Sequence, residues 1–240
     1  MEYVTVILPC YNEESRVSPT LRGIAHFMRE HPGIVEEVII VDDCSIDSTV
    51  ERCMYFVDKI PLKVERLFRN SGKWAALHHG MRSARTDWVL LMDADGSAGI
   101  DELLNLPPGW EPLKTAYFGS RFAEGSSVEG KTFLRSVVSW CYRLYARFWL
   151  WVGSGRRDVD DLQCPWKLLR RSSILNRNAF LVDRFAGDIE LACRLNADVE
   201  TLPVRFHHVR GSKVPMSAVF NMAVETVRVA MRERLLRTGK

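Results

Sequence analysis

The chain has 240 residues, of which 47% are hydrophobic and 26% are charged. These proportions are typical of a globular protein and exclude a disordered or fibrous chain. The 33 basic and 30 acidic residues leave a formal net charge of only +3, so we expect no nucleic-acid partner. The length predicts one α/β domain with additional elements.

Several sorting and metal signals are missing. Met1 leads directly into the apolar residues 3–8, with no basic region or cleavage site of a signal peptide. Arginines interrupt the richest apolar stretch, residues 133–152, before it reaches the roughly 18 residues that a spanning helix needs. The six cysteines form no CxxC pair, and the pairs His78-His79 and His207-His208 lack the spacing of a zinc site. We expect a cytoplasmic protein, soluble or peripheral on the cytoplasmic face of a membrane.

The first half of the chain alternates between two hydrophobic patterns. Short runs rich in branched and aromatic residues predict buried strands at residues 3–8, 37–42, 62–67 and 88–93. The segments between them predict helices at residues 14–29, 48–59 and 73–84. This alternation implies a mainly parallel central sheet flanked by helices.

The pattern is looser in the second half. It predicts a strand at 115–122, a mobile loop at 124–130, a helix at 188–196, a strand at 199–206 and an amphipathic helix at 216–236. We expect one domain over residues 1–215 and a C-terminal amphipathic helix within residues 216–240.

Carboxylates follow three of the predicted parallel strands. Residues 9–13 end in a glutamate after the first strand, Asp42 and Asp43 end the second, and Asp93 and Asp95 follow the fourth. The carboxyl ends of parallel strands meet in one crevice, where ligands bind, and a bound cation would relieve the repulsion between carboxylates. Asp93 and Asp95 point the same way in an extended segment, which suits a divalent ion that also holds a diphosphate. A plain turn at a strand end is the alternative. Because no GxGxxG or GxxxxGK[ST] occurs, a dinucleotide fold and a P-loop lack their phosphate cradle.

The ordered motifs resemble a known family. The segments VILPCYNEE, EVIIVDDCSIDST, NSGKWAALHHGMRSARTDWVLLMDAD and FGSRF resemble those of glycosyltransferase family 2, which has the nucleotide-sugar-binding GT-A fold. The later segments DLQCPWKLLRR and FAGDIELACRLNADVETLPVRFHHVRGSKV resemble the dolichyl-phosphate glucose synthase and mannose synthase group. The resemblance covers about residues 3–215, with Pro165-Trp166 where the group has Gly-Phe.

The resemblance implies a nucleotide-sugar site and a Mg²⁺ or Mn²⁺ ion. The implied donor-binding residues are Pro9, Tyr11, Glu13, Asp42, Asp43, Lys73, Asp93, Ala94, Gln163 and Trp166. Among them, Asp43 would accept a hydrogen bond from the base, and Gln163 and Trp166 would face the sugar. Asp93 and Asp95 would hold the metal, which neutralises the leaving nucleoside diphosphate. Ser97 stands where mannose synthases have a glutamine that assists the metal.

The acceptor side is also assigned by resemblance. A lipid phosphate is already an anion at neutral pH, so it needs no general base but does need arginine or lysine nearby. The resemblance implies that Arg121, Arg135 and Lys213 bind this phosphate, and that Arg121 and Arg135 form the catalytic set with Asp95 and Asp188. Solvated surface charge is the alternative for the three cations. Asp188 matches the base of relatives with hydroxyl acceptors, and capping of a helix start is its alternative.

Residues 131–157 combine aromatic side chains with arginines. This mixture predicts a helix lying on a membrane surface, with its aromatic residues inserted and its cations on anionic lipid. A core or dimer-interface helix with snorkelling arginines is the alternative. The helix at 216–236 is a second membrane contact or a packing helix.

The predicted function is inverting, metal-dependent transfer of a hexose from a nucleotide sugar to polyprenyl or dolichyl phosphate. UDP-glucose is the first expected donor and GDP-mannose the second, because the QCPWK segment resembles the QCGFK of the glucose group. One alternative is a family 2 transferase with a soluble hydroxyl acceptor and Asp188 as base. Another is a non-catalytic nucleotide-sugar-binding protein at a membrane surface.

Overall fold

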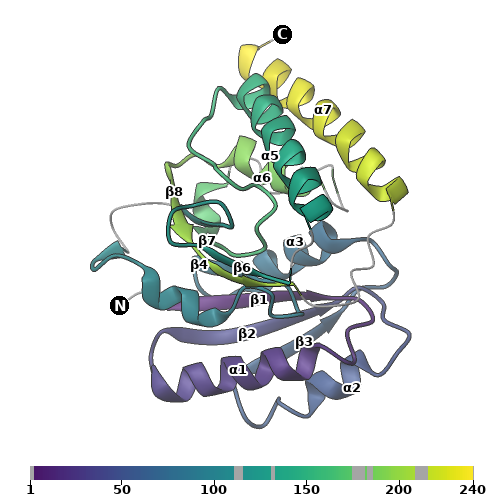
Figure 1. Ribbon diagram of the computed structural model, residues 1–240. Helices are drawn as coiled ribbons and strands as arrows, with labels where there is room; N and C mark the ends of the chain where they lie inside the picture. Colours follow the sequence, from purple (N-terminus) through teal and green to yellow (C-terminus); the bar gives the residue numbers. More distant parts are fainter. Residues whose placement is uncertain are drawn as a thin grey trace.

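The computed structural model describes residues 3–110, 116–130, 133–174, 182, 186–208 and 216–239. Within them, a seven-stranded sheet has the strand order β3-β2-β1-β4-β7-β5-β8 (Figure 1). The strands are β1 (Val4–Cys10), β2 (Val35–Asp42), β3 (Leu62–Arg66), β4 (Trp88–Leu91), β5 (Ala116–Ser120), β7 (Lys167–Arg170) and β8 (Val199–Pro203). Only β7 runs antiparallel to its two neighbours. The expected mainly parallel α/β architecture is therefore confirmed.

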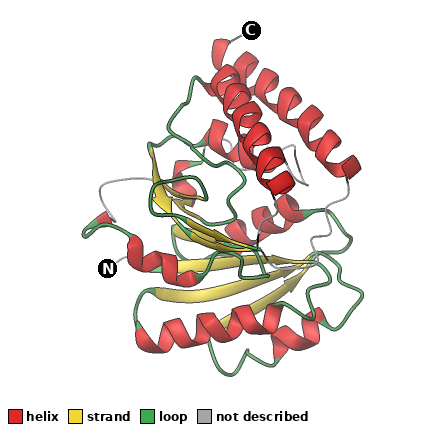
Figure 2. Cartoon of the chain, viewed as in Figure 1, coloured by secondary structure: helices red, strands yellow, loops and turns green. Residues whose placement is uncertain are grey.

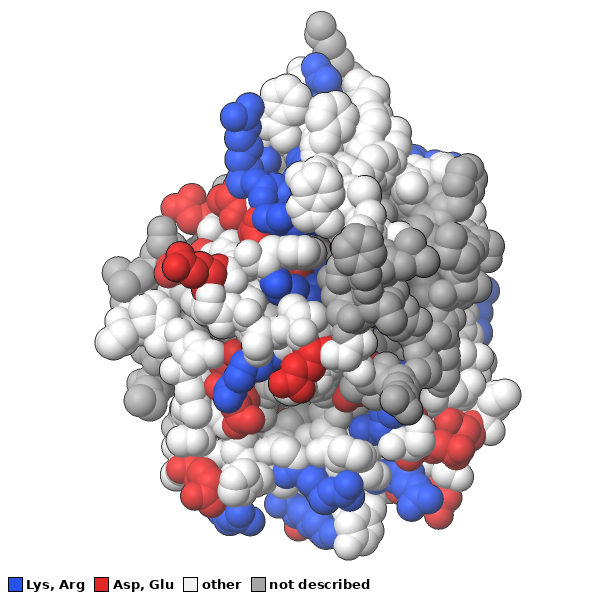
Figure 3. All heavy atoms as spheres, viewed as in Figure 1, with Lys and Arg blue, Asp and Glu red and all other residues white. Residues whose placement is uncertain are grey.

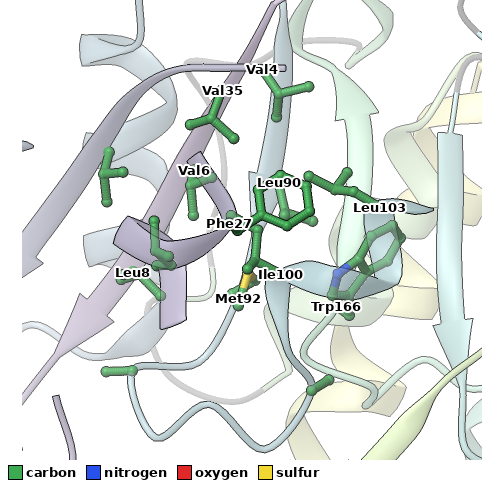
Figure 4. Packing of buried hydrophobic residues seen from close by; sticks show 14 of the residues in the cluster. Val4, Val6, Leu8, Phe27, Val35, Leu90, Met92, Ile100, Leu103 and Trp166 are labelled. Carbon is green, nitrogen blue, oxygen red and sulfur yellow. The ribbon is translucent and has the colours of Figure 1, made fainter. Parts of the chain in front are cut away.

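Helices cover both faces of the sheet (Figure 2). The helices α1 (Val17–Glu30) and α2 (Thr49–Met54) lie on one face, and α3 (Lys73–Ser83), α5 (Phe133–Ser154), α6 (Gly187–Arg194) and α7 (Met216–Thr238) lie on the other (Figure 1). Strand side chains alternate between the two resulting cores: Val6 and Leu8 of β1 pack toward α1, whereas Ile7 packs toward α3. The first core also holds the short 3₁₀ helix Ile100–Asn105 (Figure 4).

Two elements of the second half differ from the expectation. No strand was expected at residues 167–170, yet β7 inserts there between β4 and β5. The loop expected to be mobile at 124–130 instead carries β6 (Ser127–Glu129), which pairs with β9 (Arg205–His207). The two unexpected strands, β6 and β7, are short. The pairings that stabilise them join residues far apart in the chain, so local sequence patterns do not indicate them.

The helices α5 and α7 pack closely against each other. Adding a Cβ to Gly153 of α5 would place it 2.9 Å from the backbone of Ala230 in α7, so the two helices approach where only glycine fits. The Tyr145 hydroxyl of α5 also donates a hydrogen bond to the Ala223 carbonyl of α7, at 2.8 Å. In the part of the chain that the structure describes, no helix is long and apolar enough to cross a membrane.

His78 makes the stability of this fold sensitive to acid. Burial on α3, together with the nearby Arg194 and Arg82, lowers the pKa of His78 from its ordinary 6.5 to about 4. Between these two pH values the unfolded chain binds a proton that the folded chain does not, so stability is complete above pH 6.5 and falls toward pH 4. We expect a loss of about 2 kcal/mol over this window, allowing for partial exposure of the ring.

Urea unfolding of the wild type and of His78→Gln across this pH range tests the prediction. The variant should show a flatter dependence of unfolding free energy on pH, whereas the exposed control His26→Gln should follow the wild type. Parallel curves for the wild type and His78→Gln would refute the assignment.

Candidate active site

The loops that follow β1 and β2 are tied together at the carboxyl edge of the sheet. The Asn12 backbone donates a hydrogen bond to Ser45 Oγ at 2.9 Å, and the Ile46 backbone donates one back to Asn12 Oδ1 at 2.9 Å. The Glu13 backbone donates to Thr49 Oγ1 at 2.7 Å. Asn12 has a φ of 53°, in the left-handed region that asparagine tolerates better than most residues. These bonds join residues 11–13 to residues 45–49 in one continuous surface, which we call the ledge.

The expected nucleotide-binding residues at the end of β1 lie on this ledge. Tyr11 is 40% exposed, and Pro9 is half-buried beside it. Glu13 is half-buried, and its Oε1 lies 2.5 Å from Nη2 of Arg16, one turn further along the chain. Tyr11 therefore offers a ring to a ligand, while Glu13 orients an arginine.

The two aspartates at the end of β2 have different environments. Asp42 is fully buried, and its carboxylate accepts the Ser45 N–H and lies 3.2 Å from Nε of Arg66. The Asp42 side chain thereby stabilises the turn after β2, and its expected contact with the donor stays a prediction. Asp43 accepts the N–H groups of Ser71 and Gly72 at 2.6 and 2.8 Å. Asp43 thereby fixes the start of α3. If a nucleotide base also donated a hydrogen bond to Asp43, the two carboxylate oxygens would accept it in addition to these backbone N–H groups.

Asp93 and Asp95 follow β4 as expected, and both remain partly exposed. Lys73 at the start of α3 places its Nζ 2.5 Å from Asp93 Oδ1. Burial opposes the charge on Lys73, but the carboxylates of Asp93, Asp188 and Asp95 outweigh burial and raise the pKa of Lys73. The buried Ala94 between the two aspartates accepts a hydrogen bond from Thr20 Oγ1 through its carbonyl, at 2.8 Å.

These two aspartates fit a hard divalent cation. Carboxylate oxygens suit Mg²⁺ and Mn²⁺, and the Lys73 ammonium on Asp93 shows that this carboxylate accepts a cation. Across the described residues, no group of three or more His, Cys, Asp or Glu side chains is placed to hold a metal. A metal held by Asp93 and Asp95 would therefore complete its coordination with ligand phosphate and water, as Mg²⁺ commonly does.

Asp188 lies in the first turn of α6 and does not cap the helix. Its Oδ1 is 2.7 Å from Nζ of the buried Lys167, and its Oδ2 accepts a hydrogen bond from Trp74 Nε1 at 3.4 Å. The preceding Gly187 packs against the Trp74 ring, where an added Cβ would lie only 2.1 Å from the nearest ring atom. Sequence reasoning gave no role to Lys167 or Trp74, although Lys167 belongs to the QCPWK motif.

The two residues expected to face the sugar are placed differently. Trp166 is fully buried in the same core cluster as Leu103 (Figure 4), and the expected contact between its ring and a sugar stays a prediction. A large aromatic residue here fills the core beneath β7. Gln163 is half-buried, and its Nε2 lies 3.3 Å from the sulfur of Met222 in α7. The expected contact between Gln163 and the sugar also stays a prediction.

Arg121 is bound to a carboxylate of its own chain. Its Nε and Nη2 donate to the two oxygens of Asp161 at 2.7 and 3.0 Å, and the Asp161 side chain is only 3% exposed. Burial opposes the charge on Arg121, but Asp161 outweighs it and raises the pKa of Arg121. Despite its own burial, Asp161 has a pKa held below its ordinary value by Arg121. Arg121 can therefore offer an anion only the remaining Nη1 edge.

The structure brings four of the expected residues together. Lys73, Asp93, Asp95 and Asp188 lie close enough that all three carboxylates act on the pKa of the lysine. The side chain of Arg135, in the first turn of α5, lies outside the described part of the structure, and so does Lys213.

Acidic side chains thus follow the carboxyl ends of the parallel strands of this sheet, which is the edge where α/β enzymes bind their ligands. The family model Glycosyl transferase family 2 matches residues 5–171, and the chain belongs to this family. It is a glycosyltransferase with the GT-A fold.

Its relatives include dolichyl-phosphate β-glucosyltransferases. One from Trichomonas vaginalis is 30% identical, with 95% of this chain and 71% of the relative aligned. Those of Saccharomyces cerevisiae and Homo sapiens are 28% and 27% identical, each aligned over 95% of this chain and over 72% and 75% of their own length.

Two solved structures share the fold at low sequence identity. Staphylococcus aureus TarS has a TM-score of 0.65 at 19% identity, covering 98% of this chain, which spans 66% of that structure. Glucosyl-3-phosphoglycerate synthase from Mycobacterium tuberculosis, in complex with Mn²⁺, UDP and glucosyl-3-phosphoglycerate, has a TM-score of 0.65 at 17% identity, covering 97% and 80% of the two chains.

Proposed function

We propose that this enzyme transfers glucose from UDP-glucose to a polyprenyl phosphate such as dolichyl phosphate, with inversion at the anomeric carbon. The observation that carries the proposal is the contact of Lys73 Nζ with Asp93 Oδ1 at 2.5 Å at the carboxyl edge of a GT-A sheet, with Asp188 bound to Trp74, the residue after Lys73. The donor sugar and the acceptor follow from relatives named as dolichyl-phosphate β-glucosyltransferases. GDP-mannose is the second candidate donor.

The chain's own residues position the donor. Tyr11 and the ledge after β1 would receive the nucleoside, and Asp43 fixes the start of α3, where Lys73 lies on Asp93 and would meet the diphosphate. Asp93 and Asp95 would hold a Mg²⁺ or Mn²⁺ ion, which supplies positive charge to the leaving nucleoside diphosphate. Support for this metal comes from the Mn²⁺ and UDP in the M. tuberculosis structure of the same fold. Lys73 adds a fixed charge on the same side.

A phosphate acceptor suits the environment of Asp188 better than a hydroxyl acceptor does. A phosphate oxygen attacks the anomeric carbon from the face opposite the diphosphate, and the bond between that carbon and the diphosphate oxygen breaks. This nucleophile carries no proton that must be removed. A hydroxyl acceptor needs a base, and both oxygens of Asp188 are already engaged by Lys167 and Trp74.

We also propose that α5 lies on a membrane surface. Its outer side presents apolar side chains about half-exposed and one helical turn apart: Val137, Trp140, Leu144, Phe148 and Trp151. Uncharged atoms dominate the surface over α5 (Figure 3). A surface of this kind inserts into the boundary between headgroups and acyl chains, where a polyprenyl phosphate presents its phosphate.

Removing two of these aromatic side chains should weaken binding to vesicles. We expect Trp140→Ser combined with Phe148→Ser to lower the vesicle partition coefficient at least about 10-fold, because each ring contributes about 1 kcal/mol or more when buried. Co-sedimentation with phosphatidylcholine and phosphatidylserine vesicles measures this. The exposed aromatic residues Tyr55 and Phe68 lie outside this surface, so the double serine variant at those positions is the matched control. Equal losses for both pairs would contradict the assignment of α5.

A radiolabel transfer assay tests the proposed function. The purified protein is incubated with UDP-[¹⁴C]glucose or GDP-[¹⁴C]mannose and a short polyprenyl phosphate, with Mg²⁺, Mn²⁺ or chelator. Organic-extractable product from UDP-glucose that disappears with chelator supports the proposal. Hydrolysis of the donor without lipid product would overturn the phosphate acceptor, and product from GDP-mannose alone would overturn the donor.

A further inference from the structure

A cluster of charged side chains joins α5 to the acceptor side of the site, and we call it the Asp160 cluster. The Arg143 Nη2 donates a hydrogen bond to Asp160 Oδ1, and the Arg143 Nε donates to the Asp160 carbonyl at 3.1 Å. The Arg147 Nη1 donates to the same Oδ1 at 2.6 Å. The Ser120 hydroxyl donates to Asp160 Oδ2 at 2.6 Å. Two guanidinium groups and a hydroxyl therefore converge on one carboxylate.

The cluster adjoins the pair formed by Arg121 and Asp161. Ser120 ends β5 and precedes Arg121, while Asp160 precedes Asp161, the partner of Arg121. Asp188 also acts electrostatically on Arg121 and on Tyr142, the residue before Arg143. The cluster thus lies directly beside Arg121, the residue that the resemblance assigns to the acceptor phosphate.

The Asp160 cluster carries a net positive charge, whereas the pair of Arg121 and Asp161 is neutral. Arg121 and Asp161 form a buried bidentate pair of one positive and one negative charge, at 11% and 3% side-chain exposure. The Asp160 cluster has two positive charges against one negative, and its Arg147 and Asp160 side chains are 37% and 20% exposed. Breaking the buried pair would cost much more than redirecting the partly exposed arginines. The arginines that can turn toward an incoming anion are therefore Arg143 and Arg147.

We propose that Arg143 and Arg147 bind the phosphate of the acceptor, and that the Asp160 carboxylate occupies this site until the phosphate replaces it. This inference rests on the proposed phosphate acceptor and assigns residues that the sequence placed on lipid headgroups. Two guanidinium groups on one oxygen of a carboxylate can pair in the same way with the oxygens of a phosphate. The Ser120 hydroxyl supplies a third hydrogen bond. Asp160 also repels the phosphate, so acceptor affinity is lower than the arginines alone would give.

The first test uses a short, water-soluble isoprenyl phosphate, so that affinity for a membrane does not enter. We expect Arg143→Gln and Arg147→Gln each to raise the acceptor KM about 10-fold or more, because each loses a charge-assisted hydrogen bond. The donor KM and the donor-hydrolysis rate should change less than twofold. Arg157→Gln, which removes the same charge just beyond α5 and outside the cluster, should leave the acceptor KM unchanged. An equal effect of Arg157→Gln would overturn the site in favour of general electrostatic attraction.

The second test removes the competing charge without removing a cation. Asp160→Asn should lower the acceptor Kd about 3-fold to 10-fold, because the arginines lose their carboxylate partner and the phosphate meets no like charge. Calorimetric titration with the isoprenyl phosphate, and with the matching neutral alcohol, measures this. Tighter binding of the phosphate alone supports the proposal, and an unchanged or higher Kd overturns it because Asp160 would then only hold the turn.

These tests separate the inference from the proposed function. If the wild type makes no lipid product with any donor, the proposed function fails. If the wild type makes product and both arginine variants keep its acceptor KM, only the assignment of the Asp160 cluster fails. Thermal melting of each variant identifies a loss that comes from unfolding, and the Asp160→Asn gain cannot arise from unfolding.

Discussion

Replacing Asp95 by asparagine is expected to lower the rate of sugar transfer about 1,000-fold without unfolding the protein. The Asp95 carboxylate is partly exposed, and its Oδ2 lies 3.8 Å from Nη1 of Arg16. Its Oδ1 accepts the Ser97 N–H at 3.0 Å, a bond that the asparagine oxygen can keep. Asparagine keeps this turn but removes the charge that a divalent ion requires. Because the metal offsets the developing charge on the diphosphate, its loss acts chiefly on kcat.

The measurement is kcat and donor KM over a range of Mn²⁺ concentrations. Asp101→Asn is the matched control, because Asp101 is an exposed aspartate in the 3₁₀ helix just after this loop. The control should behave as the wild type at every metal concentration. If Asp95→Asn retains a third or more of the wild-type kcat, Asp95 is not a ligand of a catalytic metal.

Replacing Arg194 by leucine is expected to lower the free energy of unfolding by about 3–5 kcal/mol. Arg194 of α6 is 4% exposed, and its Nη2 lies 2.6 Å from Oε1 of Glu190 and 3.0 Å from Oε1 of Glu233 in α7. Both carboxylates are nearly or completely buried. Leucine fills part of the volume but removes the closer of two arginines from these like charges, since Arg232 Nη1 lies 3.7 and 3.6 Å from the same two oxygens. The cost comes from the weaker compensation of two buried charges rather than from lost packing.

Urea unfolding at neutral pH measures this effect. Arg29→Leu is the control, because Arg29 forms an exposed pair with Glu30 and its loss should cost less than about 1 kcal/mol. A cost below that value for Arg194→Leu would show that the buried network contributes little to stability. Because α6 carries Asp188, the variant should also lose activity at temperatures below its unfolding transition.

The strands of the first half could be predicted from the sequence because each is a local apolar run, and all but β3 are almost fully buried. Residues 37–42 and 88–93 overlap β2 and β4 closely, and the helix expected at 73–84 begins and ends within one residue of α3. The second half could not be predicted as well. β7 has only four residues, and its strand character depends on pairing with β4 and β5, which are distant in the chain.

The acidic residues of the site were predictable for the same reason. Asp93 and Asp95 follow a strand whose end is visible in the sequence, and parallel strands bring their carboxyl ends to one edge. The partners of these residues were not predictable. Lys167 meets Asp188, Asp161 binds Arg121, and Asp160 binds two arginines of α5, and each contact joins elements that no local pattern connects.

By itself, the sequence determined the α/β class, the mainly parallel first half, the family and the carboxylates at the strand ends. These features depend on hydrophobic periodicity and on short motifs, which act over a few residues. The tertiary structure alone decided which charged groups are free and which are already paired. In the folded protein Asp42 and Trp166 are buried, and Arg121 is paired with Asp161. Arg143 and Arg147 both form ion pairs with Asp160. Burial and ion pairing depend on which elements pack together. The residue type alone does not indicate whether a charged side chain is exposed to water or paired with a buried partner.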